Sequence, residues 1–455
     1  MADVKLKKGY HLKLEGAAAG IVEDAVFPDR VAVKPGDFIS LKPRILVEPG
    51  DDVKVGTPLF CSKENNDLVF TSPASGKVLE IVRGERRAIF EVVIETDGKQ
   101  RKRRFKYPDK KPAALKREDV IPLLLKTGLF PYLIQRPFGK IANPGDVPRD
   151  IFISAMNTSP LSADCNVILQ GHEKLFKAGI AVLKKLTSGD VHISIDGTKE
   201  APSKAVEGIK EVKVHRFTGP HPAGNVGVQI HHVAPIKGKD DIVWTISPLG
   251  VLDIGYLFLE HEIPVDRIMA VAGSAAINRK YFKTIRGAQL FSFIDEPYGD
   301  DIRFISGNVL TGKQVLQDGF ISFYDNLVSI IHEPTKYEFL GWTTLGSKKL
   351  SLSRTFLSYY ISLIRPEMNF EQKASINGGK RAFILSGIYE KVLPMDILPV
   401  FLLKSILAED IEEMEGLGIY EVIEEDVALC EYVDPSKNEI QQLLRQGLDM
   451  IEREG

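Results

Sequence analysis

The stretch Ser72-Pro73-Ala74-Ser75-Gly76-Lys77-Val78-Leu79-Glu80-Ile81-Val82 decides the fold of the N-terminal part of the chain. A turn marked by proline and glycine leads directly into a run rich in β-branched residues, which predicts a strand. The same pattern occurs earlier, because residues 43–47 and 53–60 are strand-like runs separated by the turn Glu48-Pro49-Gly50-Asp51. Short strands at close, turn-marked intervals predict a small β domain over residues 1–105.

The spacing of these strands resembles the barrel-sandwich domains of biotin- and lipoate-carrying proteins. In those carriers a modified lysine lies on a hairpin a few residues before the proline of the turn. Asn65 occupies the corresponding position here, and Lys63 is out of register. We therefore expect a barrel-sandwich scaffold without a carrier lysine. A lipoyl or biotinyl adduct on Lys63, found by mass spectrometry, would indicate a swinging-arm carrier instead.

Strand and helix patterns alternate over the second stretch, residues 106–272. The apolar strand candidates are residues 151–155, 191–195, 212–215, 241–246 and 268–272. The helix candidates are residues 117–126, 164–185, 201–209 and 250–261. Such alternation predicts a mostly parallel, Rossmann-like sheet. The first strand leads into Met156-Asn157-Thr158-Ser159-Pro160 rather than into a GxGxxG fingerprint, so NAD binding by this domain is not expected.

The third stretch, residues 273–335, reads as a small β-rich module. Its strand candidates are residues 291–294, 302–306 and 320–324. Gly307-Asn308-Val309-Leu310-Thr311-Gly312-Lys313-Gln314 resembles a nucleotide P-loop, but Gln314 replaces the Ser or Thr that holds magnesium. We expect a glycine-turned hairpin there instead. The fourth stretch, residues 336–455, reads as helical and ends in an amphipathic helix over residues 438–453.

Four of the nine histidines fall close together, at His215, His221, His231 and His232. A metal site is one interpretation, because imidazole is a common ligand. However, no HExxH motif and no nearby cysteine accompanies them, and the adjacent His231 and His232 would point to opposite faces of a strand. We therefore expect loop and strand-end histidines with ordinary hydrogen bonds, and no bound metal.

The composition excludes several classes of protein. The chain has 455 residues and a net formal charge of −2, so its overall charge does not attract nucleic acid. Lys99-Gln100-Arg101-Lys102-Arg103-Arg104-Phe105-Lys106 is a basic run, for which a solvated linker is the expected role. The three cysteines, Cys61, Cys165 and Cys430, are too few for an iron–sulfur cluster held by four thiolates, and they suit a reducing compartment. Neither a secretion signal nor a membrane span of about 20 apolar residues is expected.

Several longer motifs, in one order along nearly the whole chain, resemble those of the A subunit of the sodium-translocating NADH:quinone reductase (NQR). The motifs are Lys8-Gly9-Tyr10-His11-Leu12, Pro43-Arg44, Pro49-Gly50-Asp51, Thr127-Gly128-Leu129-Phe130, Arg136-Pro137-Phe138, Ala155-Met156-Asn157-Thr158-Ser159-Pro160-Leu161, Thr218-Gly219-Pro220-His221-Pro222-Ala223-Gly224, Pro394-Met395-Asp396-Ile397-Leu398-Pro399 and Ile451-Glu452-Arg453-Glu454-Gly455. The resemblance implies a multidomain α/β protein with a barrel-sandwich domain, a Rossmann-like domain, a small β-grasp-like (SLBB) domain and a C-terminal helical domain.

The same resemblance implies a peripheral subunit on the cytoplasmic face of a bacterial inner membrane. The complex passes electrons from NADH to ubiquinone or menaquinone and pumps sodium. The NADH site, flavins and iron centres would lie on partner subunits, and an integral membrane subunit would be a neighbour. Related flavin-binding subunits carry a glycine-rich loop near residues 127–140. Here that loop is Leu129-Phe130-Pro131-Tyr132-Leu133-Ile134, so no cofactor is expected on this chain.

Two hypotheses from different classes follow. The first is that the chain helps to bind and reduce quinone, because aromatic faces suit the ring and an arginine suits its carbonyl oxygens. The candidate quinone-binding residues are Phe130, Tyr132, Arg136, Pro137 and Phe138. The alternative is a cofactor-free docking subunit in which these aromatics pack an interdomain or intersubunit surface. No catalytic residue is expected on the chain in either case.

Overall fold

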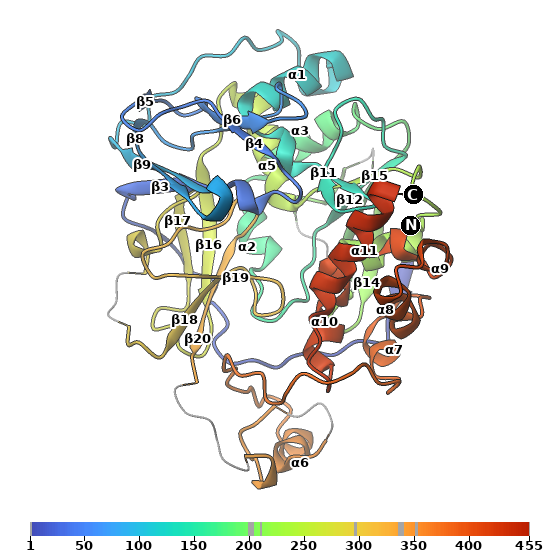
Figure 1. Cartoon of the computed structure of the whole chain (residues 1–455). Helices are drawn as coiled ribbons and strands as arrows, with labels where there is room; N and C mark the ends of the chain where they lie inside the picture. The colour runs from blue at the N-terminus through green and yellow to red at the C-terminus, as the bar shows by residue number, and fades with distance from the viewer. Residues whose placement is uncertain are drawn as a thin grey trace.

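The computed structural model describes residues 2–198, 204–209, 212–294, 298–334, 341–350 and 354–454. Figure 1 shows the N-terminal β strands above the sheet that contains β16 and β20, with the C-terminal helices α10 and α11 on the other side of the molecule. The predicted fold class, a multidomain α/β protein, is confirmed by the sheets of the described residues and the helices around them.

Two small sheets form the barrel-sandwich predicted from the opening stretch. The first contains β3 (Arg30–Val33), β9 (Ile89–Thr96), β8 (Gly76–Arg83) and β5 (Asp52–Val53) in that order. The second contains β4 (Pro43–Ile45), β6 (Pro58–Ser62) and β7 (Val69–Thr71). Phe60 and Phe70 stack with ring centroids 4.8 Å apart inside it, so the turn-marked strands close over an aromatic core.

A seven-stranded sheet follows the predicted Rossmann-like pattern. Its strands in order are β1 (Asp3–Lys5), β14 (Lys213–Thr218), β13 (Val191–Asp196), β12 (Asp150–Ser154), β15 (Val243–Thr245), β10 (Ile134–Arg136) and β11 (Lys140–Ile141). The strands from β1 to β15 run parallel, and β10 joins β15 in the antiparallel direction. β12 lies between β13 and β15, so the strand order reverses there, which is where open α/β sheets bind ligands.

Five helices accompany this sheet in the described ranges of the domain. They are α1 (Arg117–Thr127), α2 (Cys165–Leu169), α3 (Glu173–Leu183), α4 (Val226–Val233) and α5 (Pro248–Glu260). The helical stretch predicted over residues 164–185 is two helices, because the chain turns at Gly171, whose φ of 80° ends α2. The helix predicted over residues 201–209 lies partly outside the described residues, and its described part, 204–208, is a turn.

The third sheet has six strands. Their order is β19 (Lys313–Val315), β18 (Ile302–Ser306), β20 (Leu327–His332), β16 (Asp266–Ala272), β17 (Tyr281–Ile285) and β2 (Val22–Asp24). The P-loop-like stretch is the predicted hairpin, since Ser306 pairs with Lys313. The strands predicted at 291–294 and 320–324 were wrong: the first is a 3₁₀ turn, Leu290–Ser292, and the second is loop. Phe293 and Phe320 are buried in hydrophobic clusters and Phe323 packs against the core, so these apolar residues reflect burial rather than a strand.

Strand pairing crosses the expected divisions between domains. β1 and β2 come from the first stretch, yet they extend the second and third sheets. β16 comes from the second stretch and lies within the third sheet. The N-terminal segment therefore ties two later domains together, and the division of the chain at residues 105, 272 and 335 remains a proposal.

The fourth stretch is helical, as predicted. Its helices are α6 (Leu357–Ile364), α7 (Tyr389–Val392), α8 (Pro399–Leu407), α9 (Ile411–Gly416), α10 (Glu424–Val433) and α11 (Ile440–Glu454). Helices α7 to α11 share a core with Leu12, Phe152 and Val228. α6 lies apart from them, at the bottom of Figure 1. None of the helices in the described ranges is long and apolar enough to cross a membrane.

Candidate functional site

The five candidate quinone-binding residues lie on one short segment between α1 and β11, which we call the junction segment (residues 130–138). Gly128 ends α1 in the left-handed conformation, with φ of 72°, and turns the chain into a 3₁₀ turn, Phe130–Tyr132. Phe130 is fully buried, and its ring meets Trp244 edge-on with centroids 6.1 Å apart. The first aromatic of the segment is therefore part of the core of the Rossmann-like domain.

Tyr132 connects the Rossmann-like domain to the third sheet. Its hydroxyl donates to Asp253 Oδ2 at 2.7 Å and accepts from the buried guanidinium of Arg267 on β16. Its ring packs on Phe323, with centroids 4.8 Å apart. Burial raises the pKa of the Tyr132 hydroxyl, so it stays protonated and holds this polar triad in place.

Arg136 connects β10 to the C-terminal helix α10. Its Nη1 donates to Asp426 Oδ2 and its Nη2 to Glu425 Oε1, both at 2.7 Å. The Arg136 and Asp426 side chains are only 1% and 0% exposed, so this is a buried ion pair whose guanidinium is not free to reach a quinone oxygen. Burial and the charge of Asp426 raise the pKa of Glu425, against the opposing effect of Arg136.

Pro137 and Phe138 complete the segment against the same helices. Pro137 is buried, and Phe138 is partly exposed. The Phe138 ring meets Tyr420 edge-on, with centroids 6.1 Å apart, and its carbonyl oxygen accepts from Arg445 Nη1 at 2.8 Å. Phe138 has φ of 80°, a region that bulky residues rarely occupy and that these tertiary contacts hold.

The structure therefore brings the five residues together along the chain but not around one open space. Phe130, Tyr132, Arg136 and Pro137 are buried, and they face different neighbours: the Rossmann-like core, the third sheet and the C-terminal helices. The segment packs an interdomain surface in this structure. Its sequence gives no signal of this, because the partners Asp253, Arg267 and Asp426 lie more than a hundred residues away.

A small cavity lies beside the junction segment, where three domains meet. It is lined by Phe38, Phe70 and Phe323, with Lys34 and Arg286 as its cations, and Gly128 borders it. Its volume is about 20 Å³. That is room for about one water molecule.

A larger cavity of about 390 Å³ lies at the carboxyl ends of β12 and β13. Asn157, Thr158, Asp164 and Asp196 line it, and no lysine or arginine does so among the described residues. The nearby helix α2 has only five residues. The described lining of this cavity therefore presents carboxylates rather than lysine or arginine side chains.

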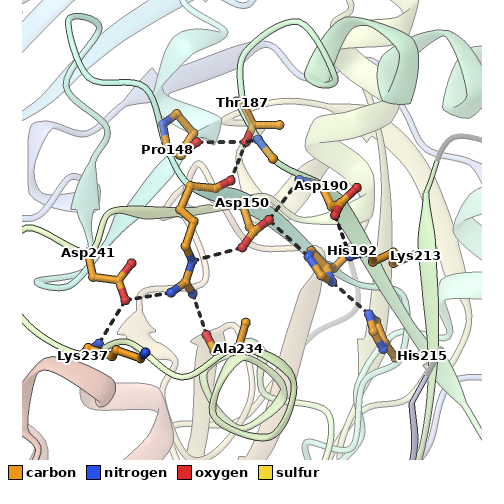
Figure 2. A network of polar contacts seen from close by, with 12 residues as sticks. Pro148, Asp150, Thr187, Asp190, His192, Lys213, His215, Ala234, Lys237 and Asp241 are labelled. Atoms are coloured by element: carbon orange, nitrogen blue, oxygen red, sulfur yellow. Dashed lines mark hydrogen bonds and ion pairs between the residues drawn. The ribbon is translucent and has the colours of Figure 1, made fainter.

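A polar network at the opposite, amino ends of the strands was not predicted from the sequence (Figure 2). Ligand atoms of Asp150, Asp190 and His192 all lie within 4.8 Å of one another, a spacing that suits a metal ion. Protein cations already meet these carboxylates: Arg149 Nε lies 3.0 Å from Asp150, and Lys213 Nζ lies 2.6 Å from Asp190. The cluster is therefore a charge-balanced ion-pair network.

The hydrogen bonds of this network fix the protons of two buried histidines. The backbone N–H of Ala2 donates to His215 Nδ1 at 3.2 Å, so His215 Nε2 carries a proton and donates to His192 Nδ1 at 2.9 Å. His192 Nε2 then donates toward Asp150 Oδ1, 3.4 Å away. Burial and the neighbouring His192 lower the pKa of His215 to about 4. Burial by itself would raise the pKa of Asp150. The hydrogen bonds from His192 and from the Asp190 backbone N–H outweigh this effect and lower the pKa to about 2.

The prediction that His231 and His232 lie on a strand was wrong. His231 and His232 lie on helix α4, so they do not point to opposite faces of a strand. A short apolar run followed by polar residues does not distinguish a strand from a helix. His231 Nδ1 pairs with Glu421 at 2.7 Å, His232 Nε2 donates to the Pro394 carbonyl at 2.8 Å, and His221 Nδ1 lies 3.2 Å from Thr158 Oγ1.

Two other predicted features lie at the surface of the barrel-sandwich domain. Lys63 is exposed in the turn between β6 and β7, and Asn65 stabilises that turn through a hydrogen bond to the Asp67 N–H. The basic run continues from β9 along Val55, where Arg101 and Arg103 make backbone hydrogen bonds. Arg101 also pairs with Asp97, and Lys102 with Glu262, so part of its charge is matched within the protein.

Comparison with known proteins gives matches over most of the chain. The family model described as "NqrA N-terminal barrel-sandwich hybrid domain" matches residues 4–97, "NqrA second alpha/beta domain" matches residues 115–263, and "NQRA C-terminal domain" matches residues 268–317. A chain of an NAD+-reducing [NiFe]-hydrogenase covers 68% of this chain and 55% of its own length, with 10% identity and a TM-score of 0.34, which is too low to support any conclusion.

Full-length relatives agree with these domain matches. Three proteins, each named as the A subunit of a Na(+)-translocating NADH-quinone reductase, are similar along 99% of this chain and 100% of their own length. They come from Pasteurella multocida at 37% identity, Yersinia pestis bv. Antiqua at 38% and Neisseria meningitidis serogroup B at 37%.

The fold and the site define a multidomain respiratory subunit, built from a barrel-sandwich, a Rossmann-like sheet and an SLBB module locked together by buried polar contacts. The chain belongs to the NqrA family, which comprises the A subunits of bacterial Na+-translocating NADH-quinone reductases. It is thus part of an NADH-quinone oxidoreductase that transports sodium.

Proposed function

We propose that this chain is a cofactor-free structural subunit that supports quinone reduction by holding other subunits in place. It lies peripherally on the cytoplasmic face of a bacterial inner membrane and docks above all on an integral membrane subunit. The NADH site, the flavins and the iron centres lie on its partners. Ubiquinone or menaquinone is the substrate of the assembled complex.

The burial of the junction segment is the observation that carries this proposal. Phe130 and Arg136 are closed to solvent, and the polar groups of Tyr132 and Arg136 are already paired with Asp253, Arg267 and Asp426. A side chain engaged in this way stabilises contacts between domains. The segment therefore supports a rigid docking body better than an open quinone site.

The cysteines and the loop at residues 129–134 also support a chain without cofactors. Cys61 and Cys430 are buried, and Cys165 is partly buried. Burial raises the pKa of the Cys430 thiol well above its usual range, so it is a poor source of the thiolate that a cluster needs. Within residues 129–134 the chain forms a buried 3₁₀ turn, Phe130–Tyr132, rather than an open glycine-rich loop that could hold a flavin phosphate.

The purified full-length chain tests this proposal. We expect a colourless protein, without flavin or iron absorption, that shows no saturable heat change when titrated with a soluble quinone analogue. The assembled complex, titrated in the same way, is the positive control. Saturable binding to the isolated chain, or a bound chromophore, would contradict the proposal.

Direct quinone contact is a second candidate function, favoured by the small aromatic cavity beside the junction segment. Phe323 lines this cavity and packs on Tyr132, so the candidate residue Tyr132 lies directly behind one of its walls. Its three aromatic rings and two cations suit a quinone ring and its oxygens. Because the cavity holds about one water, this candidate requires it to open. Loss of inhibitor binding in a Phe323→Ala complex of normal yield would support it.

A further inference from the structure

Helix α6 (Leu357–Ile364) exposes its large apolar side chains to solvent instead of burying them. Leu357, Tyr360, Leu363 and Ile364 are 41%, 57%, 63% and 83% exposed. At 100° per residue, these four side chains fall within an arc of about 120° on the helix surface. An arc of that width normally faces the core of a protein, whereas here it faces solvent.

The opposite side of α6 carries the polar residues that face the protein. Ser358 is fully buried and its hydroxyl donates to the Lys349 carbonyl. Ser362 donates to the Tyr359 carbonyl at 2.7 Å. Because the buried Ser358 lies opposite the apolar arc, α6 contacts the rest of the chain through the other side of the helix.

The described segment around α6, which we call the α6 lobe (residues 341–350 and 354–381), is anchored to the body at its C-terminal end. The Glu15 backbone N–H donates to the Phe370 carbonyl, and the Phe370 N–H donates to the Lys13 carbonyl. Lys13 Nζ also donates to the Pro366 carbonyl at 2.8 Å. Figure 1 shows α6 at the far end of the molecule from the barrel-sandwich domain, and the side chains of the apolar arc are exposed there.

The charge of the α6 lobe differs from that of the whole chain. The lobe contains seven lysines and arginines against two glutamates, a net charge of +5, while the whole chain carries −2. Lys348, Arg354 and Arg365 are exposed close to α6 in sequence. Leu345 adds a further apolar side chain, 77% exposed. An exposed apolar face flanked by cations matches the chemistry of an anionic lipid surface.

We propose that the α6 lobe binds the surface of an anionic phospholipid bilayer. The apolar arc enters the boundary between headgroups and acyl chains, and the flanking cations contact the lipid phosphates. The charge favours lipid over a purely apolar groove on a protein, because such a groove gives no partner to the exposed Lys348, Arg354 and Arg365 beside α6. This inference rests on the peripheral placement in the proposed function and adds the element that touches the membrane.

Flotation of the purified full-length chain with vesicles tests the proposal. We expect the chain to float with phosphatidylcholine vesicles that contain phosphatidylglycerol, and much less with pure phosphatidylcholine. The double variant Leu363→Glu/Ile364→Glu should lose about tenfold or more in binding, because both apolar anchors are replaced by anions. Leu316→Glu is the matched control, since Leu316 is 72% exposed on the β19 side of the molecule, and it should bind like the wild type.

The cations provide an independent arm of the experiment. Arg354→Gln/Arg365→Gln should weaken binding to anionic vesicles and reduce its dependence on salt. The proposal is overturned if the wild type does not float with anionic vesicles, or if all variants float equally. It is also overturned if the α6 variants float normally but no longer copurify with the membrane subunits, because the lobe would then bind protein. Quinone binding by the isolated chain, the failure of the proposed function, would leave each of these results unchanged.

Discussion

The junction segment and the α6 lobe both contain aromatic and cationic side chains, but these side chains are buried and paired in the first region and largely exposed in the second. Phe130 and Tyr132 in the junction segment are 0% and 3% exposed, whereas Tyr360 and Ile364 in the α6 lobe are 57% and 83% exposed. Arg136 is paired with two carboxylates, whereas the lobe has an excess of cations. Aromatic and cationic residues close together in a sequence therefore do not by themselves mark a binding surface. Their burial and pairing decide whether they stabilise the fold or face a partner.

Removal of the Arg136 charge should have the largest effect on stability. Arg136→Met leaves the buried Asp426 without its ion-pair partner, so the free energy of unfolding should fall by about 3–5 kcal/mol. Urea denaturation of the full-length chain measures this change. Lys42→Met is the control, because the Lys42–Glu64 pair is exposed and should contribute less than about 1 kcal/mol.

A double-mutant cycle shows whether this loss comes from the buried pair. Asp426→Asn in the Arg136→Met background should restore part of the lost stability, because the unpaired buried charge is removed. If Arg136→Met costs no more than Lys42→Met, Arg136 is not a structural side chain, and the contrast between the two regions fails.

Tyr132→Phe should have the next largest effect. The substitution keeps the ring contact with Phe323 and removes the hydroxyl between Asp253 and Arg267. Since these groups are buried, the free energy of unfolding should fall by about 1–3 kcal/mol. Thermal unfolding followed by circular dichroism measures it. An unchanged melting temperature would mean that the polar triad does not hold the two domains together.

A fall in pH should weaken the network of His192 and His215. This network resembles the junction segment because its ionisable groups are also buried. The pKa of His215 in the folded protein, about 4, lies below its usual value near 6.5. Its contribution is therefore complete above pH 6.5 and is lost as the pH falls toward 4. With allowance for solvent screening this is about 1–2 kcal/mol. The pH dependence of the urea midpoint should be shallower in His215→Gln over this range, and equal slopes would contradict the assignment of protons.

The smallest effect on stability is expected in the α6 lobe. Leu363→Glu/Ile364→Glu places charges where the side chains are already exposed, so the free energy of unfolding should change by less than about 0.5 kcal/mol. The same urea denaturation measures it. A loss of more than about 1 kcal/mol would indicate that the apolar arc is covered within the chain, and the two regions would no longer differ.

Much of the fold could be predicted from local patterns. Apolar runs identified β12 and β13, and the helical pattern over residues 117–126 identified α1, which ends where Gly128 adopts the left-handed conformation that suits glycine. The glycines flanking residues 308–311 predicted the β18–β19 hairpin rather than a phosphate loop. Each of these features depends on residues that are close in sequence, which is why a single sequence reveals them.

The missed features depend on residues that are distant in sequence. β1 pairs with β14, more than two hundred residues later, and no local pattern shows this partner. Asp150 and His192 form one network although about forty residues separate them. Quinone binding by residues 130–138 stays a prediction, and the contacts that favour a structural role for them come from the distant residues Asp253, Arg267 and Asp426.

The apparent KM for quinone of the complex assembled with Phe138→Ala is the most direct test of a structural junction segment. Phe138 is its partly exposed aromatic, so it can be truncated without emptying the core. The yield of assembled complex, measured on the same preparation, separates a loss of docking from a loss of binding. If the junction segment is structural, the KM for quinone of the Phe138→Ala complex should lie within a factor of about two of the wild-type value. A rise of about tenfold in KM at normal yield would show instead that this segment binds quinone.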